Sequence, residues 1–274
     1  MSRRIPNQFH FVFGLRRQWR PFHLTHYLCL ESCLQVNKPE RVYFYYHHKP
    51  WGRYWRLIRD KLTLVKVDLV PLVSRQRYAE RLVNLFRYAH HADFIRLEKL
   101  VEHGGVYADM DTLFVNPFPP RLFEQPFVIG KEDDVYDPRT NSSRPSLCNA
   151  LMMAEPGTEF GRIWQSRMAE AFDGTWSNHS CFLPQEISEE SPDLLHVEPR
   201  RSFYKHMGNP EGLKTLFEEC DPDFNNVYSL HMWSHLWASR WRRDFSGFHM
   251  GKLTEQFIRE VDTTYNIAAR RFLP

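Results

Sequence analysis

The sequence predicts an α/β fold whose central sheet is mainly parallel. Strand-like and helix-like segments alternate along the first 120 residues, an order typical of parallel strands joined by helical crossovers. The chain has 274 residues and is 42% hydrophobic, which is enough to bury one substantial core. No low-complexity linker or break in composition divides it, so we expect one domain over residues 1–274.

The first part of the chain carries the clearest alternation. Runs of β-forming residues predict strands over 7–14, 41–48 and 62–70. Apolar residues at helical spacing predict helices over 23–37 and 51–61. A longer helix over 81–103 is expected to stop at Gly104 and Gly105, and a strand over 106–111 to follow.

The second part is less regular. We expect strands over 126–133, 148–156 and 226–237, with an amphipathic helix over 158–172 and a closing helix over 250–272. Residues 176–228 hold several prolines and no clear period, so they are interpreted as mostly loop.

Composition and charge narrow the functional class. The formal net charge of +3 is too small to indicate nucleic acid binding. The first 14 residues lack the apolar run of a signal peptide, and no segment has the length that spans a bilayer. Cys29 and Cys33, four apart on an expected helix, are interpreted as core thiols. We therefore expect a cytoplasmic protein.

Basic clusters nevertheless occur at 3–9, 15–22 and 238–245. Each cluster alone is typical of a solvated face. Together they fit a protein that handles a phosphorylated ligand or makes peripheral contact with an anionic membrane surface.

Two aspartates, Asp109 and Asp111, are the main candidate for chemistry. On an extended strand both would project to the same side, where a hard divalent ion such as Mn²⁺ or Mg²⁺ could hold them together. A D-x-D alone is a weak signal. Asp93 and Arg96 lie three apart on the preceding helix, either as a surface ion pair or as ligands for sugar oxygens.

The stretch "ADFIRLEKLVEHGGVYADMDTLFVNPF" resembles the signature of the DXD-motif glycosyltransferases with a sugar-binding region. This group includes capsular-polysaccharide enzymes and Golgi mannosyl-, galactosyl- and N-acetylglucosaminyltransferases. The segments "IPNQFHFVFG", "CNALMMAEPGTEF", "WSNHSCFLPQEI" and "SLHMWSHLW" match further parts of the pattern in order. The resemblance implies a GT-A-like fold, with residues 1–120 holding the nucleotide-sugar and residues 121–274 forming the acceptor side and the closing helix.

The resemblance also implies roles for individual residues. Asp109, Asp111 and His231 would bind the metal, with His235 as a competing candidate for the third ligand. Asp93 and Arg96 would hold the donor sugar and count with the two aspartates as catalytic. The other substrate-binding candidates are Tyr107, Asn149, Trp176, Asn178, Trp233, Phe11 and Phe13. For Asn149 and the phenylalanines, a loop amide and core rings remain equally open.

The implied reaction moves a sugar from a nucleotide diphosphate, with a UDP-sugar favoured, to a hydroxyl of a glycan, a lipid-linked glycan or a protein. The resemblance implies retention of the anomeric configuration. Because the sequence offers no compelling carboxylate nucleophile, we expect the acceptor to attack from the side of the leaving group. A GDP-mannose-dependent mannosyltransferase is the first alternative. A non-catalytic nucleotide- or glycan-binding protein is a second, and a haloacid-dehalogenase-type phosphatase, suggested by "DMDTLF", is a third.

Overall fold

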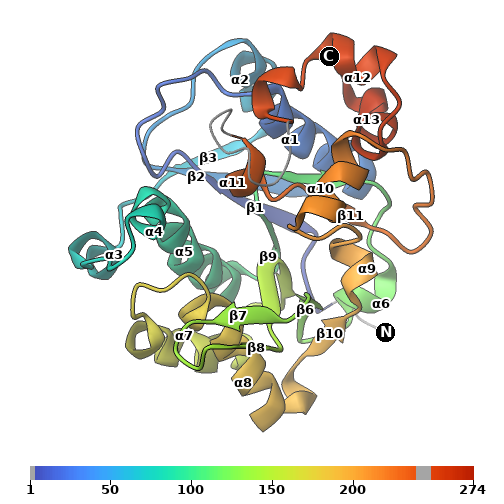
Figure 1. Cartoon of the computed structure of the whole chain (residues 1–274). Helices are drawn as coiled ribbons and strands as arrows, with labels where there is room; N and C mark the ends of the chain where they lie inside the picture. Colours follow the sequence, from blue (N-terminus) through green and yellow to red (C-terminus); the bar gives the residue numbers. More distant parts are fainter. Residues whose placement is uncertain (1–3, 239–247) are drawn as a thin grey trace.

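The central feature of the computed structural model, which describes residues 4–238 and 248–274, is a mixed, mostly parallel sheet of seven strands (Figure 1). In spatial order the strands are β10 (His196–Glu198), β6 (Phe127–Lys131), β9 (Leu147–Ala154), β4 (Gly105–Ala108), β1 (Gln8–Phe13), β2 (Arg41–Tyr46) and β3 (Thr63–Lys66). Strand β9 runs antiparallel to both of its neighbours, while β4, β1, β2 and β3 are mutually parallel. The predicted α/β class with a mainly parallel sheet is confirmed.

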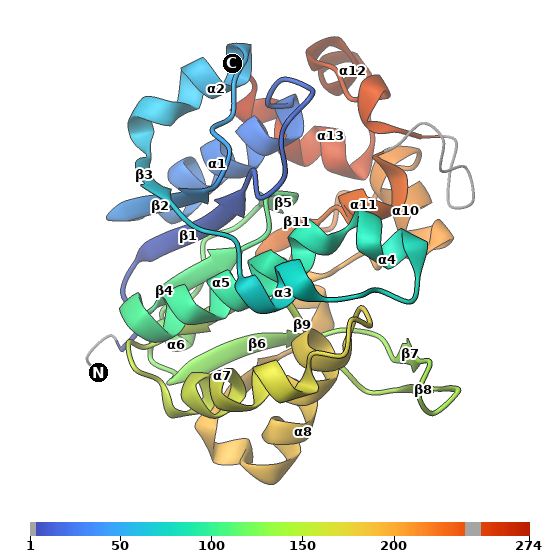
Figure 2. The same ribbon diagram turned by 90° about the vertical axis from the view of Figure 1, so that its left-hand side faces the viewer.

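Helices cover both faces of this sheet, as the two views in Figures 1 and 2 show. One face packs on α1 (Leu24–Asn37), α2 (Arg53–Ile58), α10 (Pro210–Phe217), α12 (Glu255–Glu260) and α13 (Thr264–Ala269). The other face packs on α5 (Arg87–His103), α7 (Glu159–Ala171) and α8 (Leu183–Glu190). Strand β1 serves both layers, because Phe9 and Phe11 belong to the first core and Val12 to the second.

Short elements fill the connections. They are α3 (Pro71–Arg75), α4 (Arg81–Leu85), α6 (Pro120–Phe123), α9 (Arg200–Phe203) and α11 (Ser234–Trp237), the antiparallel pair β5 (Thr112–Phe114) and β11 (Ser229–His231), and the hairpin β7 (Val135–Asp137) and β8 (Ser142–Arg144). One π-helical turn spans Asn178–Phe182, and 3-10 turns span Arg59–Lys61, Pro192–Leu194, Met250–Lys252 and Arg270–Phe272.

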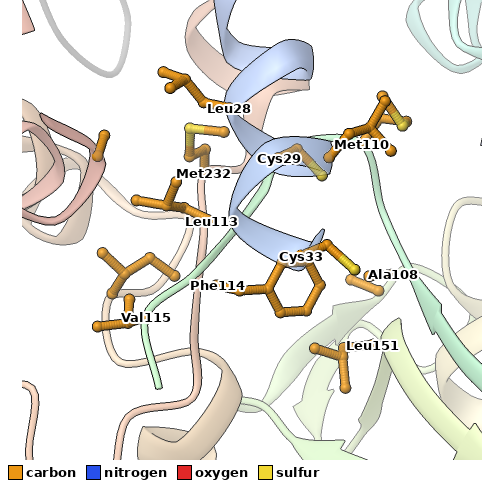
Figure 3. Packing of buried hydrophobic residues seen from close by; sticks show 14 of the residues in the cluster. Leu28, Cys29, Cys33, Ala108, Met110, Leu113, Phe114, Val115, Leu151 and Met232 are labelled. Carbon is orange, nitrogen blue, oxygen red and sulfur yellow. The ribbon is translucent and has the colours of Figure 1, made fainter. Parts of the chain in front are cut away.

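Helix α1 holds the segment that carries the two aspartates. Figure 3 shows Leu28, Cys29 and Cys33 of α1 packed against the chain from Ala108 to Val115. Both cysteines are buried free thiols, so their interpretation as core residues is confirmed. Ser32 of α1 also holds this segment, because its hydroxyl oxygen accepts a hydrogen bond from the backbone N–H of Phe114 at 3.1 Å.

Several predicted boundaries were wrong. The helix expected over 81–103 breaks at Phe86, whose non-helical backbone separates α4 from α5. The closing helix expected over 250–272 divides because Thr263 leaves the helical conformation and its hydroxyl caps α13 at the Asn266 N–H. The expected strand over 226–237 is limited to β11, after which the chain turns into α11.

The segment 176–228 was also interpreted wrongly as mostly loop, since it contains α8, β10, α9 and α10. Prolines stand at the first turns of α8 and α10, where a missing N–H costs no helical hydrogen bond. They start helices here and do not break them.

The sheet draws strands from both halves of the chain: β1 to β4 from residues 1–120, and β6, β9 and β10 from residues 121–274. The single catalytic domain stays a prediction. Among the described residues, no helix combines the length and the apolar character that crossing a bilayer requires.

Candidate active site

Asp109 and Asp111 lie in a turn between β4 and β5, not on a strand. Strand β4 ends at Ala108, and the N–H of Thr112 donates to the C=O of Asp109 at 3.1 Å across the turn. The prediction of an extended strand through both aspartates was therefore wrong. The turn still brings the two carboxylates to one place, at the carboxyl end of β4.

A glycine fixes the entry to this strand. Gly105 has φ of 107°, and a Cβ there would lie 2.5 Å from the carbonyl oxygen of Gln8 on β1. Only glycine fits such a close approach of two backbones. The tight reversal after α5 that the sequence predicted is thus present, and it sets β4 beside β1.

His231 joins the two aspartates from a distant part of the chain. Strand β11 pairs with β5 in the register His231 to Thr112, next to Asp111. The His231 Nε2 lies 3.1 Å from Asp111 Oδ1 and 3.9 Å from Asp109 Oδ2. We call Asp109, Asp111 and His231 the DXD cluster. One ligand atom from each lies within 4.8 Å of the others.

His235, the competing candidate, lies elsewhere. Its ring packs beside Trp176 at 5.2 Å and Phe86 at 6.2 Å between ring centroids. Trp233 is buried against His231, with 4.3 Å between their rings, and its indole N–H donates to the backbone oxygen of His206 at 3.0 Å. Trp233 therefore packs against His231, and its contact with substrate stays a prediction.

Charges in the DXD cluster are unequal. Burial opposes ionisation of Asp111. Two groups outweigh this effect, namely His231 and the backbone N–H of Ser234, which donates to Asp111 Oδ2 at 2.7 Å. Together they hold the pKa of Asp111 well below the usual range. For Asp109, burial prevails over the attraction of Arg96 and raises the pKa. Burial lowers the pKa of His231, yet Asp111 and Asp109 reverse this and raise it. The pKa shifts of Asp109 and His231 both favour the more positive form of each group.

Asp93 and Arg96 of α5 are both buried, so the alternative of a surface ion pair was wrong. Arg96 Nη2 lies 3.2 Å from Asp93 Oδ1 and 3.2 Å from Asp109 Oδ1. Its guanidinium also lies 4.5 Å above the Tyr107 ring. Arg96 therefore connects the helix to the DXD cluster, and it leaves one carboxylate oxygen of Asp109 unshared with it.

Asn149 and Tyr107 complete this network. Arg96 Nη1 donates to the Asn149 side-chain and backbone oxygens at 3.0 and 2.9 Å, and Asn149 Nδ2 donates to Asp93 Oδ1 at 2.8 Å. The Tyr107 hydroxyl donates to Asp109 Oδ1 at 2.6 Å. Asn149 is thus no mere loop amide. Both side chains meet the site through Asp93, Arg96 and Asp109.

His179 is a residue that sequence reasoning missed. Its Nε2 donates to Asp93 Oδ2 at 3.0 Å, and its side chain is completely buried. His90 lies beside it, 5.0 Å between ring centroids, and the two histidines with Asp93 form a second group of close ligand atoms. We call His90, Asp93 and His179 the buried cluster. The only sequence signal was its position directly after Asn178 in a matched segment.

Glu132, at the end of β6, was also passed over as part of the site. It is buried, accepts from the Ser146 hydroxyl at 2.9 Å, and acts electrostatically on His231. Burial raises its pKa, against the hydrogen bonds that it accepts.

The remaining predicted residues have mixed placements. Phe11 is fully buried in the core against Phe114, which agrees with the open alternative of a core ring, and its contact with substrate stays a prediction. Asn178 donates to the Ala171 backbone oxygen at 2.7 Å and closes its own loop, and its contact with substrate stays a prediction. Phe13 is half-buried and Trp176 exposed, so contact of either with a ligand stays a prediction.

The DXD cluster fits a divalent cation. Two carboxylates and one imidazole are donors that Mg²⁺, and still more Mn²⁺, accept. Asp109 keeps Oδ2 clear of Arg96 and Tyr107, and its side chain is 27% exposed, which gives a ligand access. In the buried cluster the Asp93 carboxylate is already occupied by Asn149, Arg96 and His179.

Comparison with known proteins gives the family. A profile described as "glycosyltransferase sugar-binding region containing DXD motif" matches residues 26–130. Glucan organizing enzyme 1 of Cryptococcus neoformans var. grubii serotype A is 30% identical over 279 residues, covering 98% of this chain and 71% of that protein. The chain belongs to the DXD-motif glycosyltransferases. It is thus an enzyme of this family, and the phosphatase hypothesis has no support.

A solved structure agrees with the fold. The galactosyltransferase LgtC, in complex with donor and acceptor sugar analogues, superposes with a TM-score of 0.51 at 12% identity, covering 90% of this chain and 94% of that one. GlyE of Streptococcus pneumoniae gives a TM-score of 0.49 at 12% identity, covering 98% and 63%. The LgtC likeness supports a GT-A-type fold for this glycosyltransferase.

Proposed function

We propose that the chain is a metal-dependent glycosyltransferase that moves a sugar from a UDP-sugar to a hydroxyl of a glycan or glycolipid. The observation that carries this proposal is the convergence of Asp109, Asp111 and His231 at the carboxyl end of β4. Ligands of α/β sheets bind at the carboxyl ends of the strands, and a carboxylate-rich metal site there suits a diphosphate.

Each group then has a defined task. Asp109, Asp111 and His231 would hold Mn²⁺ or Mg²⁺. When bound, this cation would supply Lewis-acid stabilisation of the charge that develops on the diphosphate as the bond between the anomeric carbon and the phosphate oxygen breaks. Arg96 bridges Asp93 and Asp109, so it fixes the geometry between the sugar-binding helix and the diphosphate end of the site. The acceptor hydroxyl attacks the anomeric carbon and gives its proton to the departing phosphate oxygen.

Retention of configuration is part of the proposal. Glu132 is the additional buried carboxyl of this region among the described residues, and burial raises its pKa. Burial disfavours the charged form of this carboxyl, and one of its oxygens already accepts a hydrogen bond from Ser146, so it is poorly suited as a nucleophile; this favours attack from the side of the leaving group over a covalent intermediate.

The test is nucleotide release from a panel of UDP- and GDP-sugars with Mn²⁺, with and without candidate glycan acceptors. We expect UDP release that ends when Mn²⁺ is chelated and that falls sharply in Asp109→Asn. Asp193→Asn, which changes an exposed aspartate in a 3-10 turn, serves as a matched control and should keep full activity.

Two outcomes would redirect the proposal. Release of GDP alone would move it to the GDP-mannose alternative. Binding of a nucleotide-sugar with no turnover on any acceptor, and no hydrolysis, would support the non-catalytic binding protein.

A further inference from the structure

Two loops beside the candidate active site form one surface. Residues 14–23 follow β1, and residues 47–52 follow β2. Because β1, β2 and β4 are parallel neighbours, both loops leave the sheet at the edge that carries Asp109. The guanidinium of Arg16 lies 4.4 Å above the ring of Tyr88, at the start of α5, so the first loop contacts the helix that also carries Asp93 and Arg96.

This surface exposes two tryptophans. Trp19 is 82% exposed and Trp51 is 50% exposed. Large indole rings are usually buried, and their exposure on a monomer marks a surface that contacts something else. Indoles are also the side chains that favour the boundary between water and lipid, where the ring is half-solvated and its N–H can find a polar partner.

The charge of the same two loops is one-sided. They contain Arg16, Arg17, Arg20 and Lys49 and no aspartate or glutamate. Arg17, Arg20 and Lys49 are exposed, and the Arg17 guanidinium lies 5.3 Å from the centroid of the Trp19 ring. Cations beside exposed indoles complement an anionic surface that also has an apolar layer beneath it.

Backbone contacts hold the two loops together before any partner binds. The N–H of Phe22 donates to the Trp51 carbonyl at 2.8 Å, and the N–H of His48 donates to the Gly14 carbonyl at 2.8 Å. Gly52 has φ of 109°, and a Cβ there would lie 2.6 Å from the Cβ of Pro21. The surface is therefore built into the fold and does not need to be ordered on contact.

We propose that Arg17, Trp19, Arg20, Lys49 and Trp51 dock this protein on an anionic membrane, with the candidate active site at the rim of the contact. The proposal does not depend on sugar transfer. If the proposed function also holds, docking would bring the site within reach of lipid-linked acceptors and would favour that class over free glycans or proteins.

The experiment is co-sedimentation of the full chain with vesicles of phosphatidylcholine alone or mixed with phosphatidylserine, at low and high salt. We expect binding to the anionic vesicles that salt weakens. The double variant with Arg17→Gln and Arg20→Gln should partition to anionic vesicles about twenty-five-fold more weakly, since each cation near an anionic surface contributes about a fivefold factor. Trp19→Ala with Trp51→Ala should weaken it at both salt concentrations.

Matched controls lie on other elements. Arg162→Gln on α7 and Tyr136→Ala on β7 remove an exposed cation and an exposed ring, and both should leave binding unchanged. Vesicle binding that ignores phosphatidylserine, or that the controls weaken as much as the loop variants do, would overturn the proposal. The proposal would also be overturned if the wild type bound no vesicles and the loop variants lost binding to UDP or RNA.

All of these measurements report binding, so they remain informative if turnover is never detected. If the wild-type chain binds vesicles but releases no UDP, the proposed function alone is refuted. If it releases UDP but binds no vesicles, the docking surface alone is refuted.

Discussion

The DXD cluster and the buried cluster contain the same kinds of side chain but differ in what those side chains are free to do. Each brings histidine and aspartate ligand atoms within 4.8 Å of one another. In the buried cluster, Asp93 receives hydrogen bonds or an ion pair from Asn149, Arg96 and His179, and His179 has no exposed surface. In the DXD cluster, Asp109 is partly exposed and keeps one oxygen clear of its neighbours Arg96 and Tyr107.

The comparison teaches that residue type alone does not make a metal site. The occupied oxygens of Asp93 and the loss of solvent access make the buried cluster a poor metal site, whereas the DXD cluster keeps capacity for a ligand. Arg96 joins the two, since it lies 3.2 Å from a carboxylate oxygen of each. Changes to the histidines of the two clusters should therefore separate into effects on metal binding and effects on stability.

The largest expected effect is on turnover, from Asp111→Asn. The variant removes one charge that would hold the cation, and stabilisation of a diphosphate leaving group by a metal contributes several kcal/mol, so UDP release should fall about a thousandfold. Steady-state release of UDP with saturating Mn²⁺ measures it. A decrease of less than about tenfold would mean that the cluster does not act in the chemistry.

Next is a loss of stability from Asp93→Ala. The variant leaves Arg96 buried with one ion-pair partner fewer, and breaking a buried pair from one side costs about 3–5 kcal/mol of unfolding free energy. Urea unfolding measures the change. Asp93→Asn keeps the shape and should damage turnover more than it damages binding of free UDP; equal damage to both would show that Asp93 does not act on the sugar.

A matched pair of histidine variants separates the clusters most sharply. His179→Phe keeps a ring among Phe94 and Phe172 but removes the donor to Asp93, a hydrogen bond to a charged group worth about 1.5–3 kcal/mol. We expect lower stability with unchanged Mn²⁺ affinity. His231→Phe should instead weaken Mn²⁺ binding. The reverse pattern would exchange the roles of the two clusters.

The smallest effect is on the pH dependence of stability. Burial lowers the pKa of His90 to about 4, below its unfolded value of 6.5, so its contribution is present above pH 6.5 and is lost as pH falls towards 4. The pKa of His231 is raised, so its contribution is present below pH 6.5 and is lost as pH rises through its folded pKa. The maximum slope is about 1.4 kcal/mol per pH unit for each proton.

Urea unfolding of the metal-free protein between pH 4 and 9 checks these opposite signs. Burial also lowers the pKa of His10 and His23 to about 4, so the wild type should lose stability in acid even without His90. The comparison with His90→Phe isolates the contribution of His90 to this loss. His231→Phe should reduce the decrease in unfolding free energy at alkaline pH. Parallel curves for wild type and both variants would contradict the assignment.

The sequence predicted what lies close together along the chain. The alternation of strands and helices, the glycine turn after α5, and the neighbours Asp93, Arg96, Asp109 and Asp111 all depend on local pattern. It placed the aspartates on a strand because alternation continues through "VYADMD", whereas the hydrogen bond from Thr112 to Asp109 turns the chain there.

The sequence did not indicate most of the contacts between residues far apart in the chain. His179 is 86 residues from Asp93, and no spacing rule connects them. His231 and His235 both fitted the motif, and the choice between them follows from the pairing of β11 with β5, which sequence periodicity does not specify. Phe11 and Phe13 lie on the same face of β1, yet Phe11 is fully buried against Phe114, whereas Phe13, the last residue of the strand, is only partly buried against the same core.

Direct measurement of metal binding tests the central claim most sharply. Titration of Mn²⁺ in the presence of UDP, followed by electron paramagnetic resonance, should show one bound ion per chain in the wild type and in His179→Phe. It should show none at the same concentrations in Asp109→Asn or Asp111→Asn. Retained Mn²⁺ binding in the aspartate variants, with loss in His179→Phe, would contradict the assignment of the DXD cluster as the metal site of this glycosyltransferase.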